Sequence, residues 1–198
     1  MYVVAIGDLH CGHKVGLTPP AWWVSEERYP NVYKWQRESW EAYTKMIDEQ
    51  VKRGRVDVLI ANGDLIDGRG ERSGSSELIV TDRCEQTDMA IECLRKWNAA
   101  TVLLTYGTAY HTGKIEDWED RVAEQLGADI AGRHQVDVGG VTFDARHHVG
   151  SSSIPHGRQT AVSRERLWNS ILSGEDQESR ADVILRSHVH YHSFAGGS

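Results

Sequence analysis

Apolar residues follow two different periods along the first two thirds of the chain. Short runs of β-branched and aliphatic residues predict buried strands at residues 2–6, 56–61 and 101–105. Elsewhere apolar residues recur at helical spacing, which predicts helices over residues 32–53, after a cap at Thr81 or Asp82, and around Trp118, Val122 and Leu126. Strands that alternate with helices in this way are typical of an α/β sheet with helices on its faces.

The last third of the chain predicts a hairpin, a further helix and a final strand. Two alternating runs, residues 134–138 and 141–145, lie on either side of Gly139-Gly140, a dipeptide that favours a two-residue turn. A helix and a strand are predicted to follow, at about residues 160–172 and 182–185. We expect these strands to belong to the same α/β architecture.

Length and charge narrow the class of protein. A chain of 198 residues fits one globular domain, so we expect a single domain over residues 1–198. The 22 basic and 29 acidic residues leave a net charge of −7, which argues against a broad surface for nucleic acid or anionic membranes. No apolar run is long enough for a membrane span, and Met1–Ile6 is too short for a secretory signal. Three cysteines without metal-finger spacing suit a reduced, cytoplasmic protein.

Potential metal ligands follow five of the predicted strands. They are Asp8 and His10, Asp64 and Asp67, His111, His147 and His148, and His188 and His190. In an open α/β sheet, binding sites lie beyond the carboxyl ends of the strands, so these side chains are expected to converge at one edge. A single Asp-x-His or Gly-Asp is a weak signal, because Gly-Asp is also a common turn. The shared placement of all five groups is what indicates a metal site.

The donor types indicate which metals would fit. Buried carboxylates beside imidazoles need compensation, and a divalent cation supplies it. Mixed His and Asp ligands suit Mn, Zn, Fe, Co or Ni better than Ca or Mg. Six or more ligands exceed the needs of one tetrahedral ion, which predicts two metals about 3.5–4 Å apart that share a bridging carboxylate.

The ordered motifs resemble those of the calcineurin-like metallophosphoesterase superfamily. Its pattern is Asp-x-His, Gly-Asp-x-x-Asp, Gly-Asn-His-(Asp/Glu), a later His, and Gly-His-x-His. The matching segments are Asp8-Leu9-His10, Gly63 to Asp67, Gly107 to His111, His147 or His148, and Ser187-His188-Val189-His190. The resemblance covers residues 4–190 and implies a β-sandwich flanked by α-helices, in α-β-β-α layers.

The resemblance also implies roles for these residues. Asp8, His10 and His190 would hold the first metal, Asp64 would bridge, and His147 and His188 would hold the second, with Mn favoured. His147 is preferred because it is the first histidine after the strand at residues 141–145. His148 could exchange roles with it or lie beside the substrate. Asp67 is expected to orient a ligand.

Two positions depart from the superfamily pattern. Residues 107–111 read Gly-Thr-Ala-Tyr-His, with no Asn and two extra residues, and Ser187 replaces a Gly. His111 could therefore be the general acid that protonates the leaving group, or it could be a metal ligand. Such variants look like small phage or prophage phosphoesterases, which would act in the host cytoplasm.

The activity that the resemblance implies is hydrolysis of phosphate mono- or diesters by a hydroxide that two metals activate. Arg69 and Arg72, in a glycine-rich loop, could contact the phosphate or could simply be solvated. One alternative is a nuclease, with DNA or RNA as substrate only, and another is a catalytically weak metal-binding interaction module. No membrane partner is expected, and the oligomeric state is not predicted.

Other aromatic and histidine residues are expected to be structural. Trp97, Trp118 and Trp168 lie at helical spacing and are predicted to be core residues. The remaining histidines are expected to be exposed or in loops; they are His13, His134, His156 and His192.

Overall fold

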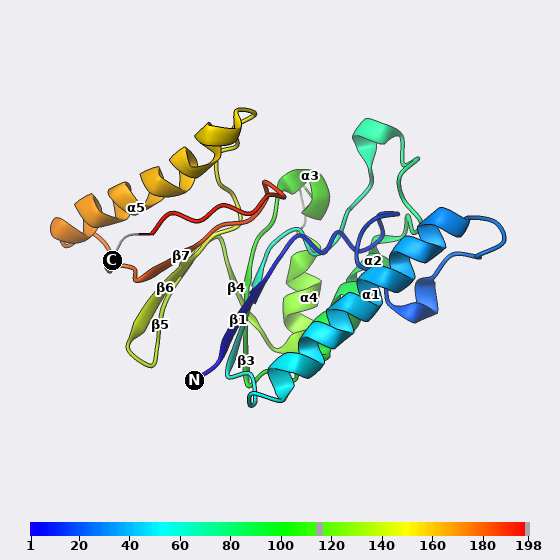
Figure 1. Ribbon diagram of the computed structural model, residues 1–198, viewed down its shortest axis with the longest axis horizontal. Coiled ribbons are helices and arrows are strands. Elements are labelled where there is room, and N and C mark those ends of the chain that lie inside the picture. Colours follow the sequence, from blue (N-terminus) through cyan, green and yellow to red (C-terminus); the bar gives the residue numbers. More distant parts are fainter. Residues whose placement is uncertain (114–116, 197–198) are drawn as a thin grey trace.

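The computed structural model describes residues 1–113 and 117–196, apart from the side chain of His156, as two sheets between layers of helices (Figure 1). The first sheet contains four parallel strands in the order β1-β2-β3-β4. They are β1 (Val3–Ile6), β2 (Val58–Asn62), β3 (Thr101–Thr105) and β4 (Asp129–Ala131). The first three are the predicted strands, whereas β4 was not predicted, because three residues are too few to show a period.

The second sheet contains three strands in the order β5-β6-β7, namely β5 (His134–Val138), β6 (Val141–Ala145) and β7 (Val183–Leu185). Strands β5 and β6 form the predicted antiparallel hairpin, and β7 pairs parallel to β6. Both turn glycines, Gly139 and Gly140, have positive φ, as this kind of two-residue turn requires.

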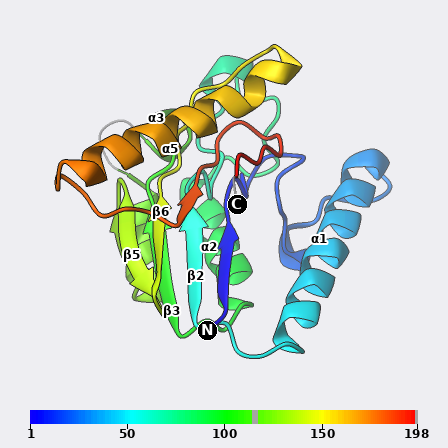
Figure 2. The same cartoon turned by 60° about the vertical axis from the view of Figure 1, so that its left-hand side comes forward.

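Helices cover the outer side of each sheet. Helices α1 (Pro30–Val51), α2 (Arg83–Arg95) and α4 (Glu119–Leu126) lie on the first sheet, and α5 (Arg158–Gly174) lies along the second (Figures 1 and 2). The short helix α3 (Ala109–Thr112) follows β3; three 3₁₀ turns are η1 (Pro20–Trp22), η2 (Glu71–Ser73) and η3 (Pro155–Gly157). These α-β-β-α layers confirm the predicted fold class.

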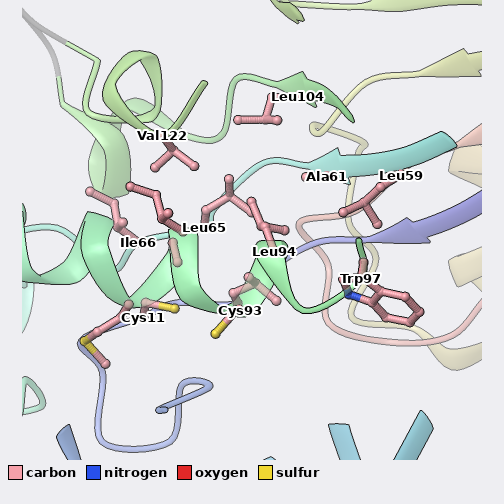
Figure 3. Packing of buried hydrophobic residues seen from close by; sticks show 14 of the residues in the cluster. Cys11, Leu59, Ala61, Leu65, Ile66, Cys93, Leu94, Trp97, Leu104 and Val122 are labelled. Atoms are coloured by element: carbon pink, nitrogen blue, oxygen red, sulfur yellow. The ribbon is translucent and has the colours of Figure 1, made fainter. Parts of the chain in front are cut away.

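The side chains of β2 alternate between two hydrophobic clusters, one on each face of the first sheet. Leu59 and Ala61 face the helices and pack with residues of α2 and α4 such as Leu94 and Val122 (Figure 3). Ile60 points the other way and packs against the second sheet. Because both faces of this strand are buried, its first four residues, 58–61, are all apolar instead of alternating.

The three tryptophans predicted to be core residues differ in burial. Trp97 is buried, as predicted, and Trp118 is partly buried against the core. The prediction for Trp168 is wrong, since this side chain is exposed on α5. Asn169 is the buried residue at this point of the helix, so Trp168 is turned about 100° toward solvent. Helical spacing shows that a stripe exists, but it does not show which stripe faces the sheet.

The prediction for His134 is also wrong. Its ring is buried at the start of β5, and its Nε2 donates to the carbonyl of Leu104, 2.7 Å away. His192 is exposed, as predicted, and the prediction for the side chain of His156 lies outside the described residues. In the described parts of the chain, none of the helices has the length and apolar character needed to cross a membrane.

Candidate metal centre

The candidate ligands lie in loops that follow five strands, and the structure brings these loops together. Asp8 and His10 follow β1, Asp64 and Asp67 follow β2, and His111 follows β3; His147 follows β6, and His188 and His190 follow β7. Residues from opposite ends of the chain meet directly, because Nε2 of His10 lies 3.1 Å from Nε2 of His190. The parallel strands of the first sheet end on one side, which explains why their loops meet there.

Asp8, His10 and His190 form a first group. Nε2 of His190 lies 3.2 Å from Oδ1 of Asp8, and Nε2 of His10 lies 3.9 Å from the same oxygen. The other ring nitrogen of His10, Nδ1, donates to Oδ1 of Asp67 at 3.0 Å. This bond leaves Nε2 of a neutral His10 without a proton, so its lone pair faces the group.

Asp64, His147 and His188 form a second group. His147 is buried, and its Nδ1 donates to the carbonyl of Asn62 at 2.7 Å. Its Nε2 lies 3.0 Å from Oδ2 of Asp64, yet it has no hydrogen-bond partner among the described residues. Nδ1 of His188 lies 3.9 Å from the same oxygen. Burial lowers the pKa of His147, but the adjacent Asp64 carboxylate outweighs it and raises the pKa, so a proton on Nε2 or a metal ion between the two atoms balances the buried carboxylate.

Asp64 lies where the two groups meet. A third set of ligand atoms, from His10, Asp64 and His111, lies within 4.8 Å of one another and joins the first two groups. Oδ1 of Asp64 accepts hydrogen bonds from the backbone N–H of Thr108, at 2.6 Å, and from its hydroxyl, at 3.0 Å. These bonds fix the carboxylate so that Oδ2 faces the histidines.

Asp67 orients two of the histidines. Its Oδ1 accepts from Nδ1 of His10 and lies 3.3 Å from Nδ1 of His111, while its carbonyl lies 3.0 Å from the same His111 nitrogen. Burial alone would raise the pKa of Asp67, but the bonds from His10 and His111 outweigh it and hold the pKa well below its usual range. The structure thus places Asp67 beside ligand candidates, as an orienting residue would be.

Five of the candidate ligands have left-handed backbone conformations. The φ angles are 53° for Asp8, 45° for His10, 50° for Asp64, 74° for His188 and 46° for His190. Non-glycine residues rarely adopt such angles, and the strain concentrates at functional sites. Strained backbone at five converging positions indicates that side-chain placement, not loop stability, determines these conformations.

A sequence model described as calcineurin-like phosphoesterase matches residues 1–128. The chain belongs to the calcineurin-like phosphoesterase family. This membership makes it a hydrolase of the phosphoesterase kind, from a family that typically binds divalent metal ions. The matched part includes the loops after β1, β2 and β3, whereas His147, His188 and His190 lie beyond it.

Two further comparisons concern individual proteins. A solved structure described as the protein of unknown function AQ665 from Aquifex aeolicus is similar over 96% of this chain and 80% of that chain, with 14% identity and a TM-score of 0.45. A comparison with curated proteins finds no relative that matches this phosphoesterase.

The departures from the family motifs have visible structural consequences. Thr108, which stands after Gly107 where the motif has Asn, bonds to Asp64 through its N–H and hydroxyl. Ser187, which stands where the motif has Gly, accepts from Nδ2 of Asn62 at 2.8 Å. Both polar side chains therefore hold neighbouring loops of the phosphoesterase together.

A cavity of about 540 Å³ opens beside the first ligand group. Its lining comprises Asp8, His10, His13, Val15, Gly16, Asp67, His111 and His190. His13 was expected to be an ordinary loop histidine, but it lines this cavity, with Nδ1 accepting from the N–H of Val15 at 3.1 Å. No sequence signal distinguished His13, because it lies outside the family motifs.

The two predicted substrate-binding residues lie at other places. Arg69 is exposed in the loop after β2. His148 is also exposed, and its ring lies 4.9 Å from that of His188. Neither belongs to the lining of the 540 Å³ cavity. Of the two adjacent histidines, the structure brings His147 to Asp64 and leaves His148 at the surface.

Sequence reasoning missed Glu119, the first residue of α4. Its buried carboxylate accepts from the N–H of Leu65 through Oε1, at 2.8 Å, and from the N–H of Gly107 through Oε2, at 2.7 Å. Leu65 follows Asp64 and Gly107 precedes Thr108, so Glu119 joins the loops after β2 and β3. Burial raises the pKa of Glu119 to about 8, although both amide bonds favour the ionised form.

We expect Glu119→Gln to loosen these loops. The glutamine amide has one acceptor oxygen, so one of the two buried N–H groups loses its partner, which lowers the free energy of unfolding by about 1–3 kcal/mol. Displacing groups that orient metal ligands also weakens metal affinity by about 10–100-fold. Urea unfolding and metal titration measure both effects. Glu124→Gln, on an exposed position of α4, is the matched control. Equal stability and affinity in Glu119→Gln and the control would refute this role.

We expect Gly107→Ala to displace Asp64. A Cβ at Gly107 would overlap both the backbone nitrogen and Oδ1 of Asp64. Relieving this overlap should lower the free energy of unfolding by about 1–3 kcal/mol and reduce metal binding. Gly132→Ala is the control, since a Cβ there meets nothing within 4 Å among the described residues. Thermal unfolding and metal titration compare the two variants, and a wild-type metal affinity in Gly107→Ala would contradict the close approach.

Proposed function

We propose that this phosphoesterase hydrolyses phosphate mono- or diesters at a dinuclear metal centre. In this proposal Asp8, His10 and His190 hold one ion, His147 and His188 hold the other, and Asp64 bridges them. The observation that carries the proposal is that Nε2 of the buried His147 faces the buried carboxylate of Asp64 at 3.0 Å, where the two ligand groups meet. Since Nδ1 of His147 already donates to Asn62, Nε2 is the ring nitrogen left to face Asp64, and a metal ion between the two atoms would be held by both.

The donor set suits borderline divalent ions. Imidazole nitrogens and carboxylate oxygens together favour Mn, Zn, Fe, Co or Ni over Ca, and Mn is our first choice. A pair of such ions supplies positive charge that lowers the pKa of a water and neutralises phosphoryl oxygens. This local charge also allows a chain of net charge −7 to accept an anionic substrate.

The protein side chains would position the substrate and its leaving group. Nδ1 of His111 lies 3.0 Å from the carbonyl of Asp67, and one of its ring nitrogens lies within 4.8 Å of ligand atoms of His10 and Asp64. From there His111 can hold a proton for the leaving oxygen, or it can add a ligand to the second ion. Arg69 and His148, both exposed near the loops of the centre, are proposed substrate contacts. A cytoplasmic location and a phage origin remain predictions of the sequence.

A variant of His111 separates its two roles. If it handles a proton, His111→Ala retains two ions per chain and loses turnover with poor leaving groups more than with good ones. If it is a ligand, the same variant binds fewer ions, and turnover falls for every leaving group. Metal analysis and a series of aryl phosphates measure these outcomes.

A substrate panel tests the proposed function. Nitrophenyl phosphate, bis-nitrophenyl phosphate, a cyclic nucleotide and single-stranded DNA are each incubated with the protein and Mn, Zn, Co, Ni or Mg. We expect hydrolysis of a mono- or diester, fastest with Mn. Cleavage of DNA alone would favour the nuclease alternative. No turnover with any substrate and fewer than two ions per chain would refute the proposal and favour a metal-binding interaction module.

A further inference from the structure

Helix α5 lies on the outside of the molecule (Figure 2), and part of its solvent-facing side is apolar. The exposed fractions are 59% for Leu167, 55% for Trp168 and 40% for Ile171. Single exposed apolar residues are ordinary, but three large side chains on adjacent turns of one helix form a continuous patch. Aromatic residues such as Trp are enriched at the centres of protein interfaces.

The opposite face of α5 anchors the helix to its own chain. Asn169 is buried, and its amide bonds to Glu178 and to the backbone of Ser179 and Ala181. At 100° per residue, Leu167 and Ile171 lie roughly opposite Asn169. The apolar stripe is therefore not the face of α5 that packs on its own sheet, because Asn169 shows that the opposite face does so.

Charged residues extend the stripe at both ends. Arg164 lies one turn before Leu167, and Glu175 lies one turn after Ile171. Arg164, Leu167 and Ile171 follow each other at intervals of three and four, so they share one side of the helix, and Glu175, the residue just after α5, continues the spacing by four. Both charged residues are exposed.

The order of these charges opposes the stability of an isolated helix. Basic residues are favourable at the C-terminus of a helix and acidic residues at the N-terminus. In α5 the first residue is Arg158, and Glu175 and Asp176 follow the last turn. The first turn has no acidic residue and the last turn no basic one. Interaction with the helix dipole therefore does not explain why basic residues lie near the start of α5 and acidic residues follow its end.

We propose that this stripe is the interface between two copies of the chain. When two α5 helices pack antiparallel about a two-fold axis near residue 169, Leu167 of each copy faces Ile171 of the other. The same axis places Arg164 of each copy beside Glu175 of the other, and the opposed helix dipoles align favourably. The stripe is self-complementary in both apolar character and charge, as a two-fold interface requires.

The length of α5 limits the area that this interface can bury. Seventeen residues span about 25 Å, so a helix pair gives an interface at the small end of the range for specific complexes. We therefore expect a reversible dimer with a dissociation constant of order 1–100 μM. Sedimentation equilibrium over concentrations on both sides of this range measures it directly.

Charge reversal provides the decisive test. Arg164→Glu alone and Glu175→Arg alone each place like charges together and should weaken the dimer at least about tenfold, whereas the double variant should restore it. Trp168→Glu should abolish the dimer, and Val51→Glu, at an equally exposed apolar position of α1, should leave it unchanged. Circular dichroism checks that each variant is folded. A wild-type monomer at every concentration, a dimer that survives Trp168→Glu, or a double variant no stronger than the single ones would each overturn the proposal.

Discussion

Asp64→Asn is expected to lower kcat by at least about a thousandfold and to reduce the bound metal below two ions per chain. The substitution keeps the shape of the side chain but removes the negative charge where the two ligand groups meet. It also changes the atom that faces Nε2 of His147, because Thr108 fixes the orientation of the side chain through Oδ1. Without the carboxylate, neither ion has the shared ligand that holds the pair together.

The measurements for this variant are turnover of a nitrophenyl ester and metal content after equilibration with Mn. Asp129→Asn is the control, because Asp129 is an exposed carboxylate in the neighbouring strand β4. We expect the control to keep wild-type values for both quantities. Full activity in Asp64→Asn would show that this carboxylate is not part of the reacting centre.

Removal of divalent ions is expected to reduce activity to below about 1% of its initial value and to lower Tm. The loss of activity follows because, among the described residues, those that line the 540 Å³ cavity include no Ser or Cys that could replace a metal-activated water. The loss of stability follows because folded protein binds the ions and unfolded chain does not. Without the ions, Nε2 of His147 must carry a proton to stay beside Oδ2 of Asp64, or the two atoms must move apart.

Dialysis against a chelator, followed by metal analysis, activity assay and thermal unfolding, provides this measurement. Addition of Mn should restore both activity and Tm, and Ca should restore neither, because its preferred ligands are all oxygen. A metal-free protein with undiminished turnover would contradict a metal-dependent reaction.

The sequence predicted the fold well where burial leaves a clear pattern. The strands β1, β2 and β3 are apolar on both faces, and the hairpin of β5 and β6 has both alternation and a Gly-Gly turn. By contrast, β4 is only three residues long, and its pairing with β3 depends on the neighbouring strand instead of its own composition. Trp168 was misplaced because helical periodicity does not reveal which face of α5 meets the sheet.

The sequence predicted which residues form the candidate site, but it did not predict their backbone conformations or the hydrogen bonds that hold them. The order of Asp8, Asp64 and His188 along the chain, each after a strand, was enough to expect that they converge. The left-handed backbone at these positions arises from tertiary contacts, so the local sequence does not predict it. Glu119 and His13 could not be predicted for a similar reason. Glu119 bonds to the backbone N–H groups of two loops, and His13 lines a cavity, and only the folded chain brings these parts together.

The most direct test of the dinuclear centre is a crystal structure of the protein grown with Mn and measured near the Mn absorption edge. The account predicts two anomalous peaks about 3.5–4 Å apart, one bound by Asp8, His10 and His190 and the other by His147 and His188, with Asp64 bound to both. No anomalous peak at these residues, or a single ion bound elsewhere on the chain, would contradict it.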